Sequence, residues 1–176
     1  MTWILVGAGA LVGVGLLAAL IGSFLPSDHT AQAVIHLAAP PDRVWALVSD
    51  FAATPRWRRD VRAVQMEPHA DGRVRFVETT KQGKTPFEVI AQHSLAQQAV
   101  RVVDDGLPFG GTWTWDLARA GNGTRLTITE QGFIRNPVFR LASRLLFKPT
   151  ATIERYLLAA AKALNESAEP VIVRER

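Results

Sequence analysis

The residue types that could carry chemistry are few and widely spaced. The four histidines, His29, His36, His69 and His93, show no HExxH or comparable spacing and so predict no metal site. The chain has no cysteine, which excludes disulfides, thiolate nucleophiles and cysteine-based zinc sites. No Gly-x-Ser-x-Gly turn is present to expose a serine nucleophile. We therefore expect no metal and no cofactor, and the sequence selects no catalytic residue.

Alternation along the apolar segments indicates which side chains share one face of a sheet. In the segment 111–117, Trp113, Trp115 and Leu117 fall on the same face. The corresponding sets in other segments are Val74, Phe76 and Glu78; Phe87, Val89, Ala91 and His93; and Leu126, Ile128 and Glu130. Together they form an apolar lining with a few polar groups, which is typical of a small-molecule pocket.

From this lining we predict a set of ligand-binding residues. The predicted set is Trp45, Trp57, Phe76, Phe87, His93, Trp113, Trp115, Ile128 and Glu130. Each polar or aromatic member also has a purely structural explanation. Glu130 could pair with Arg75 or Arg125, His93 could face outward, and the tryptophans could belong to the core.

The elements that must position these residues follow from periodicity and turn signals. Strands are predicted over 31–37, 61–67, 72–80, 87–93, 99–103, 111–117 and 124–133. A helix is predicted over 43–49 after two prolines, and a short helix or turn over 50–57. A helical stretch opens at Asn136-Pro137, and its continuation places Ile153, Tyr156 and Leu157 on one face. This succession indicates an α+β fold with an antiparallel sheet.

Three motifs carry a resemblance to a known family. They are the opening segment 35–50, IHLAAPPDRVWALVSD, with Trp57 after it, the segment Gly123-Thr-Arg-Leu-Thr127, and the segment Thr152-Ile-Glu-Arg-Tyr-Leu157. In order and spacing they resemble the START-like helix-grip (SRPBCC) superfamily, of the polyketide cyclase/dehydrase and lipid-transport type. The resemblance implies a curved sheet of about seven strands around a long C-terminal helix, with a ligand cavity between them. We expect the domain over 31–168 and a tail over 169–176.

The N-terminal segment has a different character. Residues 1–27 contain no charged side chain, and Trp3 to Leu25 form a nearly continuous apolar run. As a helix this run would reach about 35 Å, enough to span a bilayer. We therefore predict a membrane anchor over 1–26 and a linker over 27–30. The alternatives are a cleaved signal, a buried core helix, and a dinucleotide loop built on Gly7, Gly9 and Gly13.

Further expectations concern partners. The spacing of Gly9 and Gly13 fits a helix–helix dimer, although glycine is also common in membrane helices. The net charge of +4 is too small to indicate nucleic-acid binding. The basic stretch 56–62 could contact anionic headgroups or form a solvated turn. Basic residues that follow the anchor weakly favour a cytoplasmic domain.

These observations predict a membrane-anchored START-like domain that binds a hydrophobic small molecule, such as a lipid, a sterol-like or a polyketide-like compound. The first alternative is an aromatase/cyclase-type enzyme acting on a polyketide-like substrate, which the family resemblance implies. The second is a membrane-bound interaction module that holds no ligand.

Overall fold

The computed structural model describes residues 2–68, 72–104, 106–146, 148 and 150–175, and its side chains are described from residue 13 to residue 173 within these ranges. The helices are α1 (Thr2–Ser23), α2 (Pro41–Ser49), the 3-10 helix η1 (Phe51–Ala53), α3 (Thr54–Trp57), α4 (Pro137–Leu146) and α5 (Ala151–Ala163). The strands are β1 (Asp28–Leu37), β2 (Val61–Pro68), β3 (Val74–Thr80), β4 (Lys84–His93), β5 (Gln97–Val102), β6 (Phe109–Ala120), β7 (Gly123–Ile134) and β8 (Val171–Glu175).

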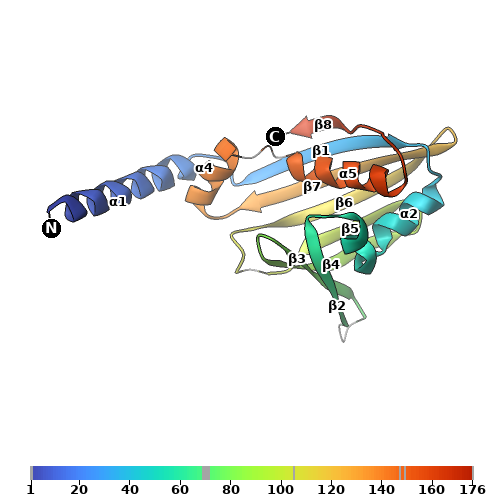
Figure 1. The fold of residues 1–176 in the computed structure, drawn as a ribbon, viewed down its shortest axis with the longest axis horizontal. Helices are drawn as coiled ribbons and strands as arrows, with labels where there is room; N and C mark the ends of the chain where they lie inside the picture. Colours follow the sequence, from blue (N-terminus) through green and yellow to red (C-terminus); the bar gives the residue numbers. More distant parts are fainter. Residues whose placement is uncertain (1, 69–71, 105, 147, 149, 176) are drawn as a thin grey trace.

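The strands form one antiparallel sheet in the order β2-β3-β4-β5-β6-β7-β1-β8 (Figure 1). The predicted α+β class and the seven predicted strands are confirmed as β1 to β7. The expected strand count was one too low, because residues 171–175 of the expected tail pair with β1 as β8. Strand β1 also begins at Asp28, inside the segment expected to be a linker.

Helix α5 packs on β1 and closes the core of the domain. Its buried positions recur every three or four residues, at Ile153, Tyr156, Leu157, Ala160 and Ala161. Alternate residues of β1 are buried as well, and two of them are the alanines Ala31 and Ala33. These small side chains let the helix approach the strand closely. The buried positions of β1 and α5 therefore indicate which face of the sheet is covered and that α5 covers it.

Helices α2 and α3 lie before β2 and cover another part of the same sheet face. Pro41 occupies the first turn of α2, where its missing N–H costs nothing, and Val44 and Val48 are buried. The Asp50 side chain caps η1 by accepting a hydrogen bond from the backbone N–H of Ala53. The chain then enters α3, which ends at Trp57.

Strands β6 and β7 lie close together at a pair of glycines. Gly111 has φ of +143° and pairs with Gly132. A Cβ on Gly111 would overlap the backbone of Gln131. The two glycines thus form a close contact that no other residue permits.

Helix α1 extends away from the domain, and its C-terminal end packs against α4 (Figure 1). The Arg140 guanidinium donates hydrogen bonds to the carbonyl oxygens of Gly22 and Leu25, at 3.2 and 2.9 Å. Within the described part of the chain, no helix is both long and apolar enough to cross a membrane. The structure therefore does not support the expected transmembrane anchor over residues 3–25. Gly9 lies outside the described side chains, so its contact with a second helix stays a prediction.

Candidate ligand-binding site

A charged cluster lies on the covered face of the sheet, beside the end of α3. Its central residue, Arg58, is held by its backbone, since its N–H donates to Thr54 O at 2.9 Å and its carbonyl accepts from Val61 N at 3.2 Å. The guanidinium donates to Glu78 Oε1 at 3.1 Å and to Asp60 Oδ2 at 2.7 Å. Arg58 is only 9% exposed, so the guanidinium is largely removed from water.

Burial controls the ionisation of this cluster. Burial raises the pKa of Glu78, and the attraction of Arg58 offsets only part of that effect. Burial also raises the pKa of Tyr156, so its phenol stays neutral well beyond the range of an ordinary tyrosine. The Arg58 guanidinium lies 5.2 Å from the centre of the Tyr156 ring, in cation–π contact. The cluster therefore combines one fixed cation, the carboxyl groups of Glu78 and Asp60, and one neutral phenol.

Aromatic rings surround Tyr156. Trp57 packs edge-on at 5.1 Å between ring centres, Trp115 lies at 5.7 Å and Trp113 at 6.1 Å. Trp113 and Trp115 are 5.8 Å apart, as expected for residues that share one face of β6. Three elements, α3, β6 and α5, thus contribute to one aromatic group at the interface between sheet and helix.

Two indole N–H donors among these aromatic residues lack a regular hydrogen bond. Trp57 Nε1 and Trp115 Nε1 are buried and lack a hydrogen-bond partner. The Trp115 N–H lies close enough to the phenol to lower the pKa of Tyr156 slightly against the larger effect of burial, but it forms no hydrogen bond of regular geometry. Buried donors without an acceptor are rare in folded proteins.

The remaining predicted apolar residues also lie on the covered face. Phe76 stacks on Phe87 with ring centres 5.3 Å apart, and on Phe51 of η1 at 4.4 Å. Ile128 is fully buried, and Trp45 packs against the core from α2. The structure thus gathers Trp57, Trp113 and Trp115 around Tyr156, whereas Phe76 and Phe87 form a separate stack.

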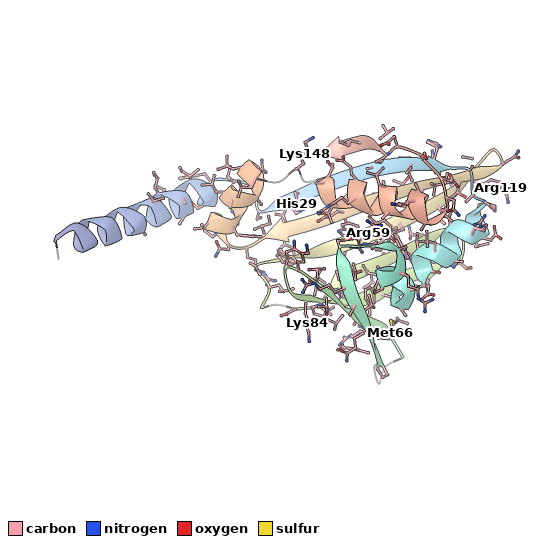
Figure 2. The ribbon with its side chains drawn as sticks, in the orientation of Figure 1. His29, Arg59, Met66, Lys84, Arg119 and Lys148 are labelled. Atoms are coloured by element: carbon pink, nitrogen blue, oxygen red, sulfur yellow. The ribbon has the colours of Figure 1, made fainter. Side chains whose placement is uncertain are left out.

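Glu130 lies on the inner face of β7 and faces His29 rather than the predicted Arg75 or Arg125. Their closest atoms, His29 Nε2 and Glu130 Oε1, are 3.4 Å apart, and both side chains are about one-fifth exposed. His29 lies near the start of β1, toward α4 (Figure 2). The pair forms because Gly132, opposite His29 in the register, has no side chain and leaves room for the imidazole.

The expected inward orientation of His93 is wrong. The register between β4 and β5 shifts between Val89 and Ala91, which reverses the faces of the residues that follow. His93 then pairs with Gln97, whose side chain donates to Asp116 on the outer face at 2.7 Å. His93 is exposed there, away from the aromatic group.

Sequence reasoning missed three residues of this region. Arg58 was placed in an exposed basic stretch, whereas the structure buries it and pairs it with carboxylates. Tyr156 was placed correctly on the inner face of the last helix but not in the site. The signal was that the only tyrosine of the chain stands on an otherwise apolar helix face. His29 was assigned to a linker, so its strand position was not considered.

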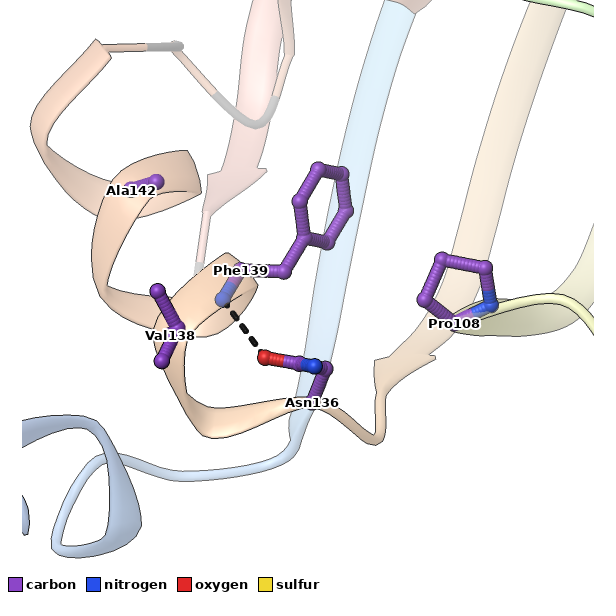
Figure 3. Close-up of a pocket in the computed structure, with 5 residues that line it drawn as sticks. All are labelled: Pro108, Asn136, Val138, Phe139 and Ala142. Atoms are coloured by element: carbon purple, nitrogen blue, oxygen red, sulfur yellow. Dashed lines mark hydrogen bonds between the residues drawn. The ribbon is translucent and has the colours of Figure 1, made fainter. Parts of the chain in front are cut away.

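Among the residues that the structure describes, no group of three His, Asp or Glu side chains could hold a metal ion. A shallow apolar hollow of about 360 Å³ lies between α4 and the loop before β6 (Figure 3). It is lined by Pro108, Asn136, Val138, Phe139 and Ala142, and the Asn136 side chain accepts a hydrogen bond from Phe139 N.

Comparisons with known proteins agree with this architecture. A family model described as polyketide cyclase / dehydrase and lipid transport matches residues 28–168. The Zhui aromatase/cyclase from Streptomyces sp. R1128 superposes with a TM-score of 0.65 at 13% identity, covering 78% of this chain and 94% of that chain. A START superfamily protein from Mycobacterium smegmatis gives a TM-score of 0.58 at 18% identity, with 78% and 97% covered.

A third structure is the di-domain ARO/CYC BexL from the BE-7585A biosynthetic pathway. It gives a TM-score of 0.64 at 14% identity, and the match covers 94% of this chain and 59% of BexL. At such low identities these structures show a shared fold and nothing finer. No match was found among curated proteins.

Proposed function

Because the chain belongs to the polyketide cyclase / dehydrase and lipid transport family, we propose that it binds a hydrophobic small molecule beside Tyr156, between the sheet and α5. The ligand class is that of a lipid, a sterol-like or a polyketide-like compound. Trp57, Trp113 and Trp115 would contact its apolar surface, and Phe76, Phe87 and Ile128 would support that wall.

One observation carries the proposal, namely two buried indole N–H groups: Trp57 Nε1 has no acceptor, and Trp115 Nε1 has none of regular geometry. A ligand oxygen next to Trp57 Nε1 or Trp115 Nε1 would satisfy that donor. Arg58 is close by and would favour a carbonyl, enol or carboxylate oxygen over a hydrocarbon. The site therefore fits an apolar molecule that carries at least one oxygen acceptor.

Extraction of the purified full chain with organic solvent, followed by mass spectrometry, tests the proposal. We expect an apolar compound that carries oxygen, at about one molecule per chain. Binding of the fluorescent probe anilinonaphthalene sulfonate gives a second measurement. Trp115→Phe removes the indole donor and leaves a smaller aromatic ring, and we expect at least about 5-fold weaker probe binding, the loss for one neutral hydrogen bond.

Trp45→Phe is the matched control, because Trp45 packs on the core from α2 and has no ring contact with Tyr156. It should leave probe binding unchanged. If no compound is extracted and the probe does not bind, the proposal fails. The interaction module without a ligand then becomes the better explanation.

The enzymatic alternative rests on His29 and Glu130. An imidazole and a carboxylate 3.4 Å apart at the end of the inner face could transfer a proton to or from a bound substrate. The structural neighbours include proteins described as aromatase/cyclase and ARO/CYC. Incubation with a linear poly-β-ketone tests this function. Formation of an aromatic product that is lost in Glu130→Gln would support it, and no product would exclude it for that substrate.

A further inference from the structure

Helix α4 exposes most of its apolar side chains, and none of its residues is buried. Leu145 and Leu146 are 74% and 72% exposed, and Val138 and Phe139 are more than 40% exposed. These residues recur at the spacing of one helix face, with Arg140 and Arg144 on the other face. A short helix with this separation of apolar and basic faces is typical of helices that lie in a lipid–water interface.

The apolar surface continues from α4 onto the neighbouring end of α1. Leu17, Leu20 and Phe24 are 57%, 58% and 82% exposed. The two helices are held together, because Arg140 binds the carbonyl oxygens of Gly22 and Leu25 and also that of Ile134. A soluble monomer rarely leaves a continuous apolar surface of this kind in water. The surface, called here the α1–α4 surface, consists of Leu17, Leu20, Phe24, Val138, Phe139, Leu145 and Leu146.

The charge around the α1–α4 surface has one sign. Between Glu130 and Glu154 the sequence contains four basic residues and no acidic residue. They are Arg135, Arg140, Arg144 and Lys148. Residues 1–27 contribute no acidic side chain either. Arg135, Arg144 and Lys148 are exposed, and the last two lie at the C-terminal end of α4 or just beyond it. The partner that fits is apolar in its interior and negatively charged at its surface.

We propose that the α1–α4 surface docks onto the surface layer of a membrane that contains anionic phospholipids. The apolar side chains enter the boundary between headgroups and acyl chains, and Arg144 and Lys148 contact the phosphates. The hollow beside Phe139 then faces the lipid (Figure 3). This docking is independent of ligand binding beside Tyr156, because the two regions share no residue.

The absence of cysteine permits a direct test in the full chain. Leu146→Cys carries a nitrobenzoxadiazole label at an exposed position of α4. Met66→Cys, on β2 at the far side of the domain, is the matched control, since Met66 is 42% exposed (Figure 2). Each labelled protein is added to vesicles of phosphatidylcholine, with and without phosphatidylglycerol. Label emission and its quenching by spin-labelled lipid are then measured.

We expect a blue shift and quenching at position 146, stronger with phosphatidylglycerol, and neither effect at position 66. Adding Arg144→Gln and Lys148→Gln should remove the dependence on phosphatidylglycerol. If the protein attached to the vesicles through α1 alone, Arg144→Gln and Lys148→Gln would leave the response of the label at position 146 unchanged. That outcome would overturn the proposal. If the label emission shifted without vesicles, and more so at higher protein concentration, the α1–α4 surface would be a contact between two copies of the chain. That outcome would also overturn the proposal.

Discussion

Arg58 and Glu78 form an ion pair inside the protein, with Arg58 Nη1 3.1 Å from Glu78 Oε1 and with side chains only 10% and 13% exposed. The two residues come from different elements, since Arg58 follows α3 and Glu78 belongs to β3. The pair therefore joins the α3 segment to the sheet beneath Tyr156. Because both charged groups are largely removed from water, each charge is stabilised mainly by its partner.

Arg58→Met should destabilise the fold strongly, since it leaves the Glu78 carboxylate buried without its cation. Removal of one partner of such a pair costs about 3–5 kcal/mol. Burial already raises the pKa of Glu78, so the loss should be greatest at neutral pH and smaller in acid, where Glu78 is protonated. Urea unfolding of the variant at several pH values measures this effect.

Two variants make that measurement specific. Arg59→Met changes an exposed neighbour and should cost less than about 1 kcal/mol. Combining Arg58→Met with Glu78→Gln removes both charges and should recover part of the loss. Equal costs for the substitutions at 58 and 59 would contradict the buried pair.

Glu88 should contribute to stability above acidic pH. On the outer face its carboxylate accepts hydrogen bonds from Arg75 at 2.6 and 2.8 Å, from Arg101 at 2.6 Å and from Arg73 at 3.2 Å. It is 1% exposed because these arginine side chains cover it, rather than because it lies in the core. The hydrogen bonds from Arg75, then those from Arg101, lower the pKa of Glu88 below its ordinary value of 4.5.

A carboxylate with a lowered pKa stabilises the fold above its unfolded pKa, and this contribution is lost as the pH falls through the folded value. Glu88→Gln should therefore be less stable than the parent near neutral pH, and the difference should shrink below about pH 4.5. Urea unfolding over this pH range measures it. Glu67→Gln, at an exposed site on β2, is the control, and a difference independent of pH would contradict the role of Glu88.

Local periodicity was enough to predict the inner face of β6 and the buried face of α5. Trp113, Trp115 and Leu117 lie together because nothing interrupts the alternation of that strand. In β4 the same reasoning failed for His93, because one register shift reverses every later side chain. Such a shift depends on the pairing with β5, which a local pattern does not contain.

Arg58 and His29 show a second limit of sequence reasoning. A basic stretch is usually exposed, and Arg58 is buried only because Glu78, 20 residues further along, reaches it across two elements. His29 meets Glu130 because Gly132, which is distant in sequence, leaves space above the sheet. Both contacts follow from tertiary structure rather than from local sequence. This explains why the aromatic wall could be predicted, whereas the burial of Arg58 and the partner of Glu130 could not.

Gly22→Ala should loosen the contact between α1 and α4. A Cβ at this position would overlap the backbone carbonyl of Pro137, whereas one at Gly15 would meet nothing within 4 Å. Overpacking of this kind costs about 1–3 kcal/mol, which opens the contact roughly 5- to 100-fold more often. Tryptic cleavage after Arg140 reports the opening, because that side chain is bound to α1. Gly15→Ala should be cleaved at the parental rate, and equal rates for both variants would contradict the contact.

Glu166 should hold the C-terminal end of α5 against the turn between β1 and α2. Its carboxylate accepts hydrogen bonds from Ala38 N at 2.7 Å and from Ala39 N at 2.8 Å. The chain reaches this position because Asn165 adopts φ of +62°, which ends the helix. Glu166→Ala should cost about 2 kcal/mol, since hydrogen bonds to a charged group contribute about 1.5–3 kcal/mol.

Glu166→Gln is the matched control, because it keeps one acceptor oxygen and should cost about half as much. Urea unfolding gives the two free energies, and amide hydrogen exchange at Ala39 locates the effect. Exchange at Ala39 should accelerate in Glu166→Ala and less so in Glu166→Gln. If the two variants were equally stable, or if the Ala39 amide exchanged at the parental rate in both, this side chain would not hold α5 to the turn.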